Sequence, residues 1–257
     1  MRKSFLPALL ALALVACTPT SNEGEEKEPT SEDKAQTIID ESIGFHGLHV
    51  LDNADFSMTF RGMDYTYSNE KGRYQYTRTQ TDSTGAKVVD ILNNMGFGRY
   101  INDEEVTLTD ERTGAYTRSV NSVIYFFRLP YGLNDEAVNK EYLGETDIKG
   151  KAYHEVKVTF EQEGGGEDFD DVFLYWFDKE DYSMDYLAYL YHTDGGGIRF
   201  REAINQREVN GVLVQDYINL RPEDENIDIM TIDELYEAGE LRKLSEIINE
   251  NIQITAK

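Results

Sequence analysis

Four side chains able to do chemistry lie close together in the chain, around a triple-glycine turn: His192, Asp194, Arg199 and Arg201. An imidazole beside a carboxylate can serve as the acid/base pair of a hydrolytic enzyme. Two arginines spaced two residues apart on a strand share one face and can clamp a carboxylate or a phosphate. They could instead pair across strands with Glu161 and Glu163. The pattern leaves these alternatives open.

A second triple-glycine turn, at residues 164–166, is predicted to lie beside the turn at 195–197. The chain from 153 to 220 has the pattern of five antiparallel strands in succession. Successive turns of such a meander alternate between the two ends of the sheet, so the first and third turns share an end. Glycine permits positive φ and a close approach of the backbone to a ligand. This end of the sheet is the predicted functional site.

The sequence contains none of the common nucleotide, nucleophile-elbow or zinc-protease patterns. His46 and His49 form an HxxH pair, but Gly47 interrupts the helix that would align them, so we expect a packed or capping histidine. Cys17 is the only cysteine, which excludes a disulfide or a cysteine metal cluster within the chain. No metal and no cofactor are predicted, and the only catalytic candidates are His192 and Asp194.

The strands at 172–177 and 186–191 are apolar or aromatic on both faces, with Leu174 and Trp176 opposing Phe173 and Tyr175. Both faces must therefore be covered. Helices would form one cover; a second sheet layer, or a cavity on the concave side of a curved sheet, would form the other. The 17 tyrosines could line such a cavity or simply fill the core.

Apolar side chains at i, i+3, i+4 and i+7 predict a helix at 119–129 that packs on the sheet or into its concave side. It carries Tyr125 and Phe126 on its broad apolar face. The residues predicted to contact a ligand are Tyr125, Phe126, Trp176, Tyr189, His192, Arg199 and Arg201.

The remaining elements follow from periodicity. Helical spacing predicts an amphipathic helix at 34–46, and alternation predicts strands at 56–61, 73–79 and 88–92 and a further one through Val106 and Leu108. Thr231 and Glu234 have the form of a capping box, which predicts one or two helices through 235–248. A last short strand is expected at 252–254.

The N-terminus has the pattern of a targeting segment. Arg2 and Lys3 precede an apolar run at 5–15 that is too short to span a bilayer. The sequence Leu-Val-Ala-Cys ending at Cys17 resembles the bacterial lipobox, which implies a signal peptide at 1–16 and acylation of Cys17. The alternative is an ordinary signal peptide with a chance cysteine. Because Thr18 is not aspartate, the resemblance favours the outer membrane, with the periplasmic or surface face left open.

Residues 17–33 are acidic and contain no aliphatic or aromatic side chain beyond the cysteine, so they are predicted to form a disordered tether. Residues 34–257 suffice for one domain with a core of its own. The formal charge of −24 repels phosphate backbones and anionic headgroups. Nucleic-acid binding is therefore disfavoured, and membrane attachment is expected through the anchor alone.

Several segments resemble an uncharacterised family of Gram-negative lipoproteins: 119–126, Tyr142-Leu143-Gly144, 158–160 with its GGG turn, and 191–202. At fold level the pattern is similar to the LolA/LolB lipoprotein carriers. The resemblance implies an α+β fold, in which a curved antiparallel half-barrel has helices packed on its concave, acyl-binding side. It brings no catalytic residues with it.

Three functions are consistent with the sequence. The first is a non-catalytic, membrane-tethered binder of a hydrophobic or amphipathic ligand, such as a lipid or an acylated molecule. The second is an envelope hydrolase that uses His192 with Asp194 or a neighbouring glutamate. The third is a structural partner in an envelope complex.

Overall fold

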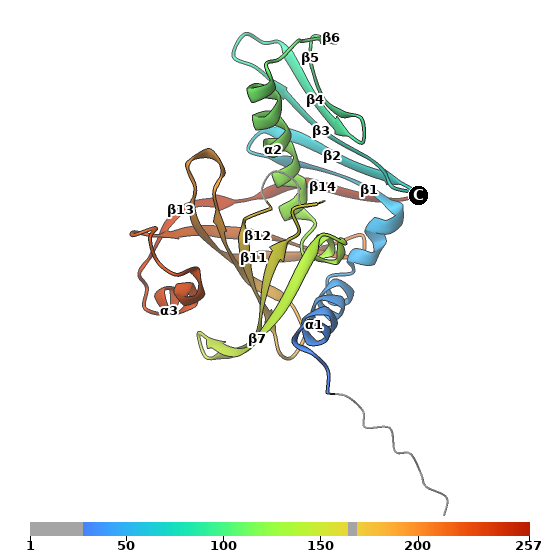
Figure 1. Ribbon diagram of the computed structural model, residues 1–257. Helices are drawn as coiled ribbons and strands as arrows, with labels where there is room; N and C mark the ends of the chain where they lie inside the picture. The colour runs from blue at the N-terminus through green and yellow to red at the C-terminus, as the bar shows by residue number, and fades with distance from the viewer. Residues whose placement is uncertain (1–27, 164–168) are drawn as a thin grey trace, which may run out of the picture.

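The computed structural model describes residues 28–163 and 169–257. These residues form two antiparallel sheets of seven strands each, together with helices that pack against them (Figure 1). The helices are α1 (Ser31–Phe45), α2 (Asp110–Phe127) and α3 (Ile232–Glu237), and short 3₁₀ segments cover Leu48–Asn53, Tyr131–Asn134, Thr193–Gly195 and Ile229–Thr231.

The first sheet has the order β14-β1-β2-β3-β4-β5-β6. Its strands are β1 (Ala54–Phe60), β2 (Met63–Glu70), β3 (Arg73–Thr81), β4 (Lys87–Asn93), β5 (Gly96–Ile101), β6 (Glu104–Glu105) and β14 (Asn249–Ala256). The predicted strands at 56–61, 73–79, 88–92 and 252–254 are all present. The strand predicted through Val106 and Leu108 is wrong, because the chain pairs at β5 and β6 instead and then leads into α2.

The second sheet has the order β13-β12-β11-β10-β9-β8-β7 and contains the predicted meander. Its strands are β7 (Val138–Ile148), β8 (Lys151–Phe160), β9 (Val172–Asp178), β10 (Met184–Tyr191), β11 (Gly197–Val209), β12 (Val212–Pro222) and β13 (Leu241–Ile247). All five predicted strands between 153 and 220 are confirmed.

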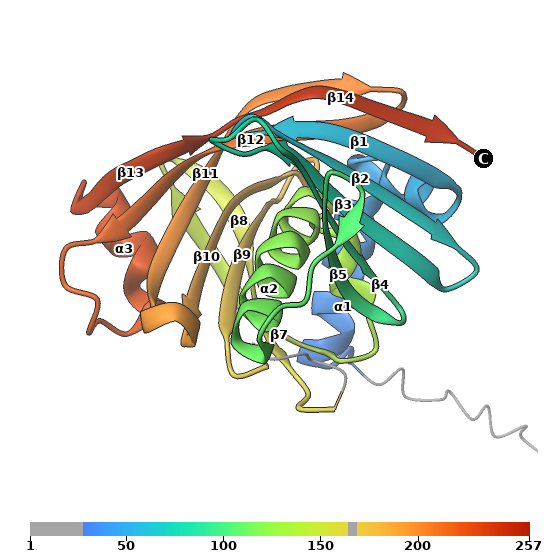
Figure 2. The same cartoon turned by 90° about the horizontal axis from the view of Figure 1, so that it is seen from above.

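The two sheets are joined by the last two strands, because β13 leads through a single residue into β14, which pairs with β1. Side chains of the β11–β12 hairpin reinforce this joint: Arg207 Nη2 donates to Asn249 O at 2.5 Å, and Asn210 Nδ2 donates to Ile254 O at 2.6 Å. Together the sheets arch over α1 and α2 (Figure 2). The predicted α+β class, with a curved antiparallel sheet and helices on its concave side, is confirmed, although the curved surface consists of two sheets.

Helix α2 begins at Asp110, nine residues before the predicted start at 119, and its first half is polar. Thr109 caps it by accepting a hydrogen bond from Arg112 N at 3.4 Å. The polar half docks on the first sheet through Asp90, which is fully buried and accepts from Arg78 Nη2 at 2.6 Å and from Arg99 Nε at 2.6 Å. Because the helix meets this cluster through polar side chains, its first half has no hydrophobic periodicity and was not predicted from the sequence.

Two contacts link this buried ion cluster directly to α2. Arg78 Nη1 donates to Ser119 Oγ at 2.7 Å, and the Arg99 guanidinium lies 3.5 Å from the centre of the Tyr116 ring. Further along, Val120 and Ile124 are fully buried in the core beneath both sheets. The helix is therefore fixed to the first sheet by ions and to the core by apolar packing.

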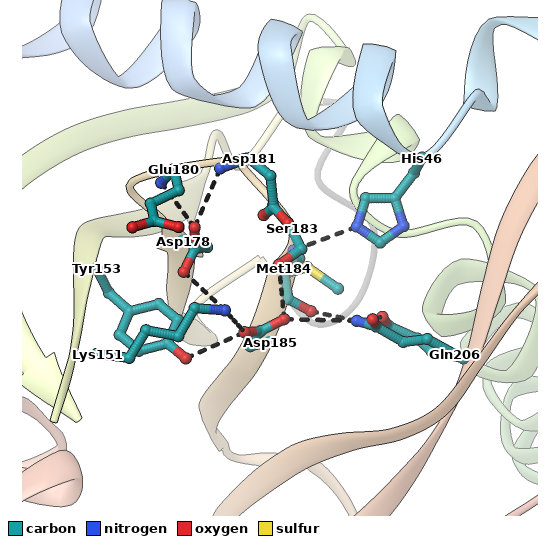
Figure 3. Close-up of polar contacts among 11 residues, drawn as sticks. His46, Lys151, Tyr153, Asp178, Glu180, Asp181, Ser183, Met184, Asp185 and Gln206 are labelled. Carbon is teal, nitrogen blue, oxygen red and sulfur yellow. Dashed lines mark hydrogen bonds and ion pairs between the residues drawn. The ribbon is translucent and has the colours of Figure 1, made fainter. Parts of the chain in front are cut away.

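Helix α1 is locked to the second sheet where it ends (Figure 3). His46 is buried, its Nε2 accepts from Met184 N at 3.2 Å, and its Nδ1 lies 3.3 Å from Leu213 O. Burial lowers the pKa of His46, which favours the neutral ring that can accept at one nitrogen and donate at the other. The expectation of a packed histidine is thus confirmed, and α1 begins at Ser31, three residues before the predicted helix.

Next to this joint, Lys151 ties the end of β9 to the start of β10 (Figure 3). Its Nζ lies 2.7 Å from Asp178 Oδ2 and 2.9 Å from Asp185 Oδ2. Tyr153 and Ser183 also donate to Asp185. These polar contacts close the end of the sheet opposite the triple-glycine turns.

The outer face of the second sheet carries a separate apolar cluster, in which Trp176 and Phe200 pack against Tyr236 of α3. The helix ends at Glu237, and Gly239 beyond it has a φ of +72° that lets Glu240 N donate to Leu235 O at 2.9 Å. The helix predicted through 235–248 is therefore wrong beyond this point, and 241–247 form β13. The predicted capping box is wrong as well: the Thr231 side chain makes no cap, and Asp228 instead accepts from Met230 N.

The Gly47 backbone gives a stability prediction. A Cβ at Gly47 would lie 2.0 Å from Gly211 O, and its φ is +67°. Gly47→Ala should therefore lower the free energy of unfolding in urea by more than about 3 kcal/mol, since it adds a backbone clash to the cost of the conformation. Gly62→Ala is the matched control: its φ is +73° with open space around it, and it should cost about 1 kcal/mol. Equal losses in the two variants would show that the backbones of Gly47 and Gly211 do not approach each other this closely.

Glu155 gives a pH prediction. Burial, and then the charge of Asp233, raise the pKa of Glu155 to about 7. Because its folded pKa lies above the unfolded value, its ionisation weakens the fold progressively as pH rises from about 4.5 to 7. In thermal or urea unfolding, Glu155→Gln should be more stable than wild type by about 1 kcal/mol at pH 8, after screening of this half-buried group, and indistinguishable at pH 4. Glu250→Gln, which removes an exposed carboxylate, is the control; a Glu155 effect no larger than the control's at pH 8 would contradict the assignment.

Candidate functional site

A half-open cleft of about 480 Å³ lies between one side of α2, the β1–β2 turn and the inner face of the second sheet. Aromatic rings dominate its lining: Phe60, Tyr65, Phe126, Phe127, Tyr189, Tyr191 and Tyr217. The cleft is concave, and its surface is divided about evenly between polar and apolar atoms, which suits an amphipathic small molecule.

Arg201 of β11 lies deepest among the charged groups of this cleft, with 7% of its surface exposed. Its guanidinium stacks on Phe126 of α2 at 3.7 Å from the ring centre, and its Nη2 donates to Tyr189 Oη at 2.9 Å. The Phe126 and Tyr189 rings in turn lie 5.1 Å apart. Within residues 28–163 and 169–257 no carboxylate pairs with Arg201, and its buried Nε has no acceptor.

Arg199 lies on the same face of β11, closer to the triple-glycine turn. Its Nη2 donates to Tyr191 Oη at 2.6 Å, and its Nη1 forms an ion pair with Glu225 Oε1 at 3.3 Å. A Cβ at Gly197 would lie 2.8 Å from Glu225 and 3.0 Å from Arg199, at a φ of +145°. The third glycine of the turn is therefore required for this cluster to pack.

Asn219 of β12 lies directly opposite Arg201 in the strand register and also lines the cleft. Its Nδ2 donates to Ser245 Oγ at 3.3 Å, while its buried Oδ1 has no donor among the described residues. Next to it, burial raises the pKa of Tyr217 to about 12, so the phenol keeps its proton. Arg201 and Asn219 thus provide an unmatched cation and an unmatched acceptor at one place.

The described lining of the cleft is rich in arginine, although the chain is acidic. This described lining contains four arginines, and no aspartate, glutamate, lysine or histidine: Arg61, Arg118, Arg199 and Arg201. The chain as a whole carries −24. Buried charges are normally paired because desolvation is costly, so an unpaired guanidinium in a cavity indicates a functional role.

Four of the seven predicted ligand residues line the cleft, namely Phe126, Tyr189, Arg199 and Arg201. Tyr125 does not, because it turns to the core, where its hydroxyl lies 3.2 Å from that of Tyr175. Trp176 is fully buried in the outer cluster on the opposite face of the sheet. The structure therefore does not place Tyr125 or Trp176 where they could contact a ligand in this cleft.

The triple-glycine end is only partly described. His192 N donates to Asp171 Oδ1 at 3.2 Å, which places the end of the β8–β9 connection beside the third turn, as the meander predicts. Residues 164–168 and the side chain of Asp194 lie outside what the structure describes. The His192 side chain is exposed and is not among the residues that line the cleft.

The arginines do not make the predicted cross-strand pairs with Glu161 and Glu163. Strands β10 and β9 separate β11 from β8, so these carboxylates are out of reach. Arg199 pairs with Glu225 instead, and Glu161 accepts from Asn139 Nδ2 at 3.0 Å. The part of the chain that the structure describes holds no group of three or more potential metal ligands and no helix long and apolar enough to cross a membrane.

Sequence reasoning missed several cleft residues, including Tyr65, Ser122, Tyr217 and Asn219. The alternation of Tyr65 and Tyr67 with polar neighbours was a usable signal for β2. The Asn210-Gly211 turn was a signal for the β11–β12 hairpin, since both residues have positive φ, at 51° and 81°.

The model of a protein family of unknown function, DUF6503, matches residues 28–249. The chain belongs to this family. The resemblance to an uncharacterised family is thereby confirmed. No curated protein matches the chain.

The chain is also similar to several solved structures at low sequence identity. A LolA superfamily protein from Nitrosomonas europaea is 9% identical, with 85% of this chain and 92% of that chain covered and a TM-score of 0.45. A DUF1329 family protein from Desulfovibrio piger is 12% identical, with the same coverage and a TM-score of 0.40. A putative outer membrane lipoprotein-sorting protein domain from Vibrio parahaemolyticus is 7% identical, with coverage of 87% and 92% and a TM-score of 0.39. Likeness at this level transfers no activity to the chain.

Because Arg201 has no carboxylate partner among the described residues, its replacement gives a stability prediction. Arg201→Met keeps the packing on Phe126 and removes a buried cation without a carboxylate, so it should raise the free energy of unfolding by about 1 kcal/mol. Arg207→Met is the matched control, because Arg207 forms two bonds to the buried Asp216, at 3.1 and 3.2 Å. That change should cost about 3 kcal/mol. Urea unfolding measures both, and a similar loss in the two variants would mean that Arg201 is a structural cation like Arg207.

Proposed function

We propose that this protein is a non-catalytic binder of a hydrophobic or amphipathic ligand, a lipid or an acylated molecule, held in the cleft beside α2. The observation that carries the proposal is the composition of the cleft, about 480 Å³ lined by seven aromatic rings and four arginines. Each methylene group of a ligand that leaves water contributes about 0.8 kcal/mol, so a cleft of this kind suits an acyl chain.

The absence of acid/base groups in the described lining favours binding over catalysis. Hydrolysis requires a general base or an activated nucleophile within reach of the substrate. The described cleft offers hydroxyls of Ser119, Ser122 and Thr193, and none is paired with a histidine or carboxylate in the lining. A buried arginine beside aromatic rings orients and holds an anion, which is the chemistry of recognition.

The proposal includes attachment to a membrane through acylated Cys17, with residues 17–33 as a tether, a single domain at 34–257 and a position at the outer membrane. The lipobox and the charge pattern of the first residues support it. Cys17 lies outside the described residues. Helix α1 already begins at Ser31, so the tether is slightly shorter than the acidic segment.

Native mass spectrometry of the protein extracted from cells in mild detergent tests the proposal. A non-covalently bound lipid should co-purify with the wild type and be lost on denaturation. Ser122→Trp places a large ring in the cleft and should remove most of this lipid, by at least about tenfold. Asn121→Trp, on the neighbouring exposed position that does not line the cleft, should retain it. Equal lipid in both variants, or none in the wild type, would contradict the proposal.

The same spectra separate the anchor from the ligand. Acyl chains on Cys17 should remain as added mass after denaturation, on a chain that starts at Cys17. Cys17→Ser should abolish this covalent mass and leave the non-covalent ligand of the cleft in place. If the denatured wild-type chain carries no acyl mass, the proposed anchor at Cys17 is wrong, whereas the proposed binding of a ligand in the cleft is unaffected.

A further inference from the structure

The buried Arg201, which has no carboxylate partner among the described residues, narrows the ligand class. The described cleft carries four arginines and no carboxylate, whereas the chain carries −24. A neutral or cationic ligand would bury the Arg201 guanidinium further without compensating its charge. We infer that the natural ligand is a single-chain amphiphile with one anionic end group, a carboxylate or a phosphate monoester, received by Arg201. This inference rests on the proposed function and specifies its ligand.

Arg201 is the group of the cleft best suited to receive the anion. A guanidinium has five N–H donors in a planar fork that fits carboxylate and phosphate oxygens. Among the described residues only one of these donors, on Nη2, has an acceptor, the hydroxyl of Tyr189. Phe126 covers one face of the guanidinium at 3.7 Å, which fixes its plane and leaves its edge as the polar surface.

The other polar groups have secondary roles. Arg199 is already neutralised in part by Glu225 and bonded to Tyr191, so it adds positive potential near Arg201 more than it adds free donors. Asn219 lies opposite Arg201, and its unmatched Oδ1 can accept from a hydroxyl or from a protonated oxygen of the end group. An anion at Arg201 would thus meet a donor fork and an acceptor side by side.

The volume of the cleft favours one chain. A group of the size of a water or a methylene takes up roughly 30 Å³. The cleft of about 480 Å³ then holds about 16 such groups, enough for one acyl chain with a small polar end.

The test is isothermal titration of the full chain, carrying Cys17→Ser so that its own acyl groups cannot compete, after bound lipid has been removed. The probes share one alkyl chain length: decanoate, decyl phosphate, 1-decanol and decyltrimethylammonium, all below their micelle concentrations. At least one of the two anions should bind at least about tenfold more tightly than the alcohol, and the cation should bind more weakly still. A preference between decanoate and decyl phosphate distinguishes the two anionic end groups.

Three variants locate the anion. Arg201→Met should reduce anion affinity to that of the alcohol and leave the affinity for 1-decanol unchanged. Arg201→Lys keeps the charge without the planar fork and should retain part of the preference. Arg112→Met removes an exposed positive charge from α2 outside the cleft and should change no affinity by more than about twofold. Urea unfolding of each variant confirms that it is folded.

The outcomes distinguish a failure of the inference about the anionic end group from a failure of the proposed function. If 1-decanol binds as tightly as both anions and Arg201→Met changes neither, the inference about the end group is wrong and the proposed function stands. If none of the four amphiphiles binds to the wild type, the proposed function itself fails. An anion preference that survives Arg201→Met but is lost in Arg199→Met would move the subsite to Arg199 and overturn the assignment to Arg201.

Discussion

The position of helix α2 between the two sheets is the constraint on which the cleft depends. Asp90 is fully buried between Arg78 and Arg99, and this ion cluster binds the polar half of the helix to the first sheet through Ser119 and Tyr116. Removing one member of such a cluster leaves an uncompensated buried charge and costs about 3–5 kcal/mol, so the surface on which the helix docks is rigid. A helix held by apolar contacts alone could slide until it filled the space beneath the sheets. Because its first half is held on the first sheet, the helix meets the second sheet near its C-terminal end, at Tyr125 and Phe126, and a cleft is left beside it.

The same architecture explains why an unpaired arginine is tolerated. Arg201 is enclosed by Phe126 of α2 and by Tyr189 and Tyr217 of the second sheet, which shield it from water without offering a carboxylate. Such an arrangement lowers the stability of the empty protein, and natural proteins retain it mainly where binding or catalysis requires it. In this chain two apolar clusters, one beneath the sheets and one on the outer face of the second sheet, stabilise the fold and offset the cost of burying Arg201.

Much of the fold could be predicted from the sequence, and the errors have physical causes. The meander was predicted correctly because its short apolar runs are separated by turns rich in glycine and polar residues. The site was harder, because β-bulges shift the register by one residue. The bulge between Met184 and Tyr186 pairs Tyr189 with Phe173; a regular hairpin would pair Tyr189 with Val172 and place it on the face of Trp176. Trp176 and Tyr189 therefore lie on opposite faces of the sheet, and one ligand in the cleft cannot contact both.

A second bulge, between Ile204 and Arg207, changes which residue of β12 lies opposite Arg201. Counting back from the Asn210-Gly211 turn without this bulge places Arg201 opposite Leu220, whereas the bulge brings Asn219 there.

A ligand-bound crystal structure tests the account most directly. It should show one elongated ligand in the cleft, with an anionic group within about 3 Å of the Arg201 guanidinium and an apolar chain along Phe126 and Tyr65. A cleft filled by the protein's own side chains, or a ligand bound elsewhere with Arg201 still unpaired, would contradict it.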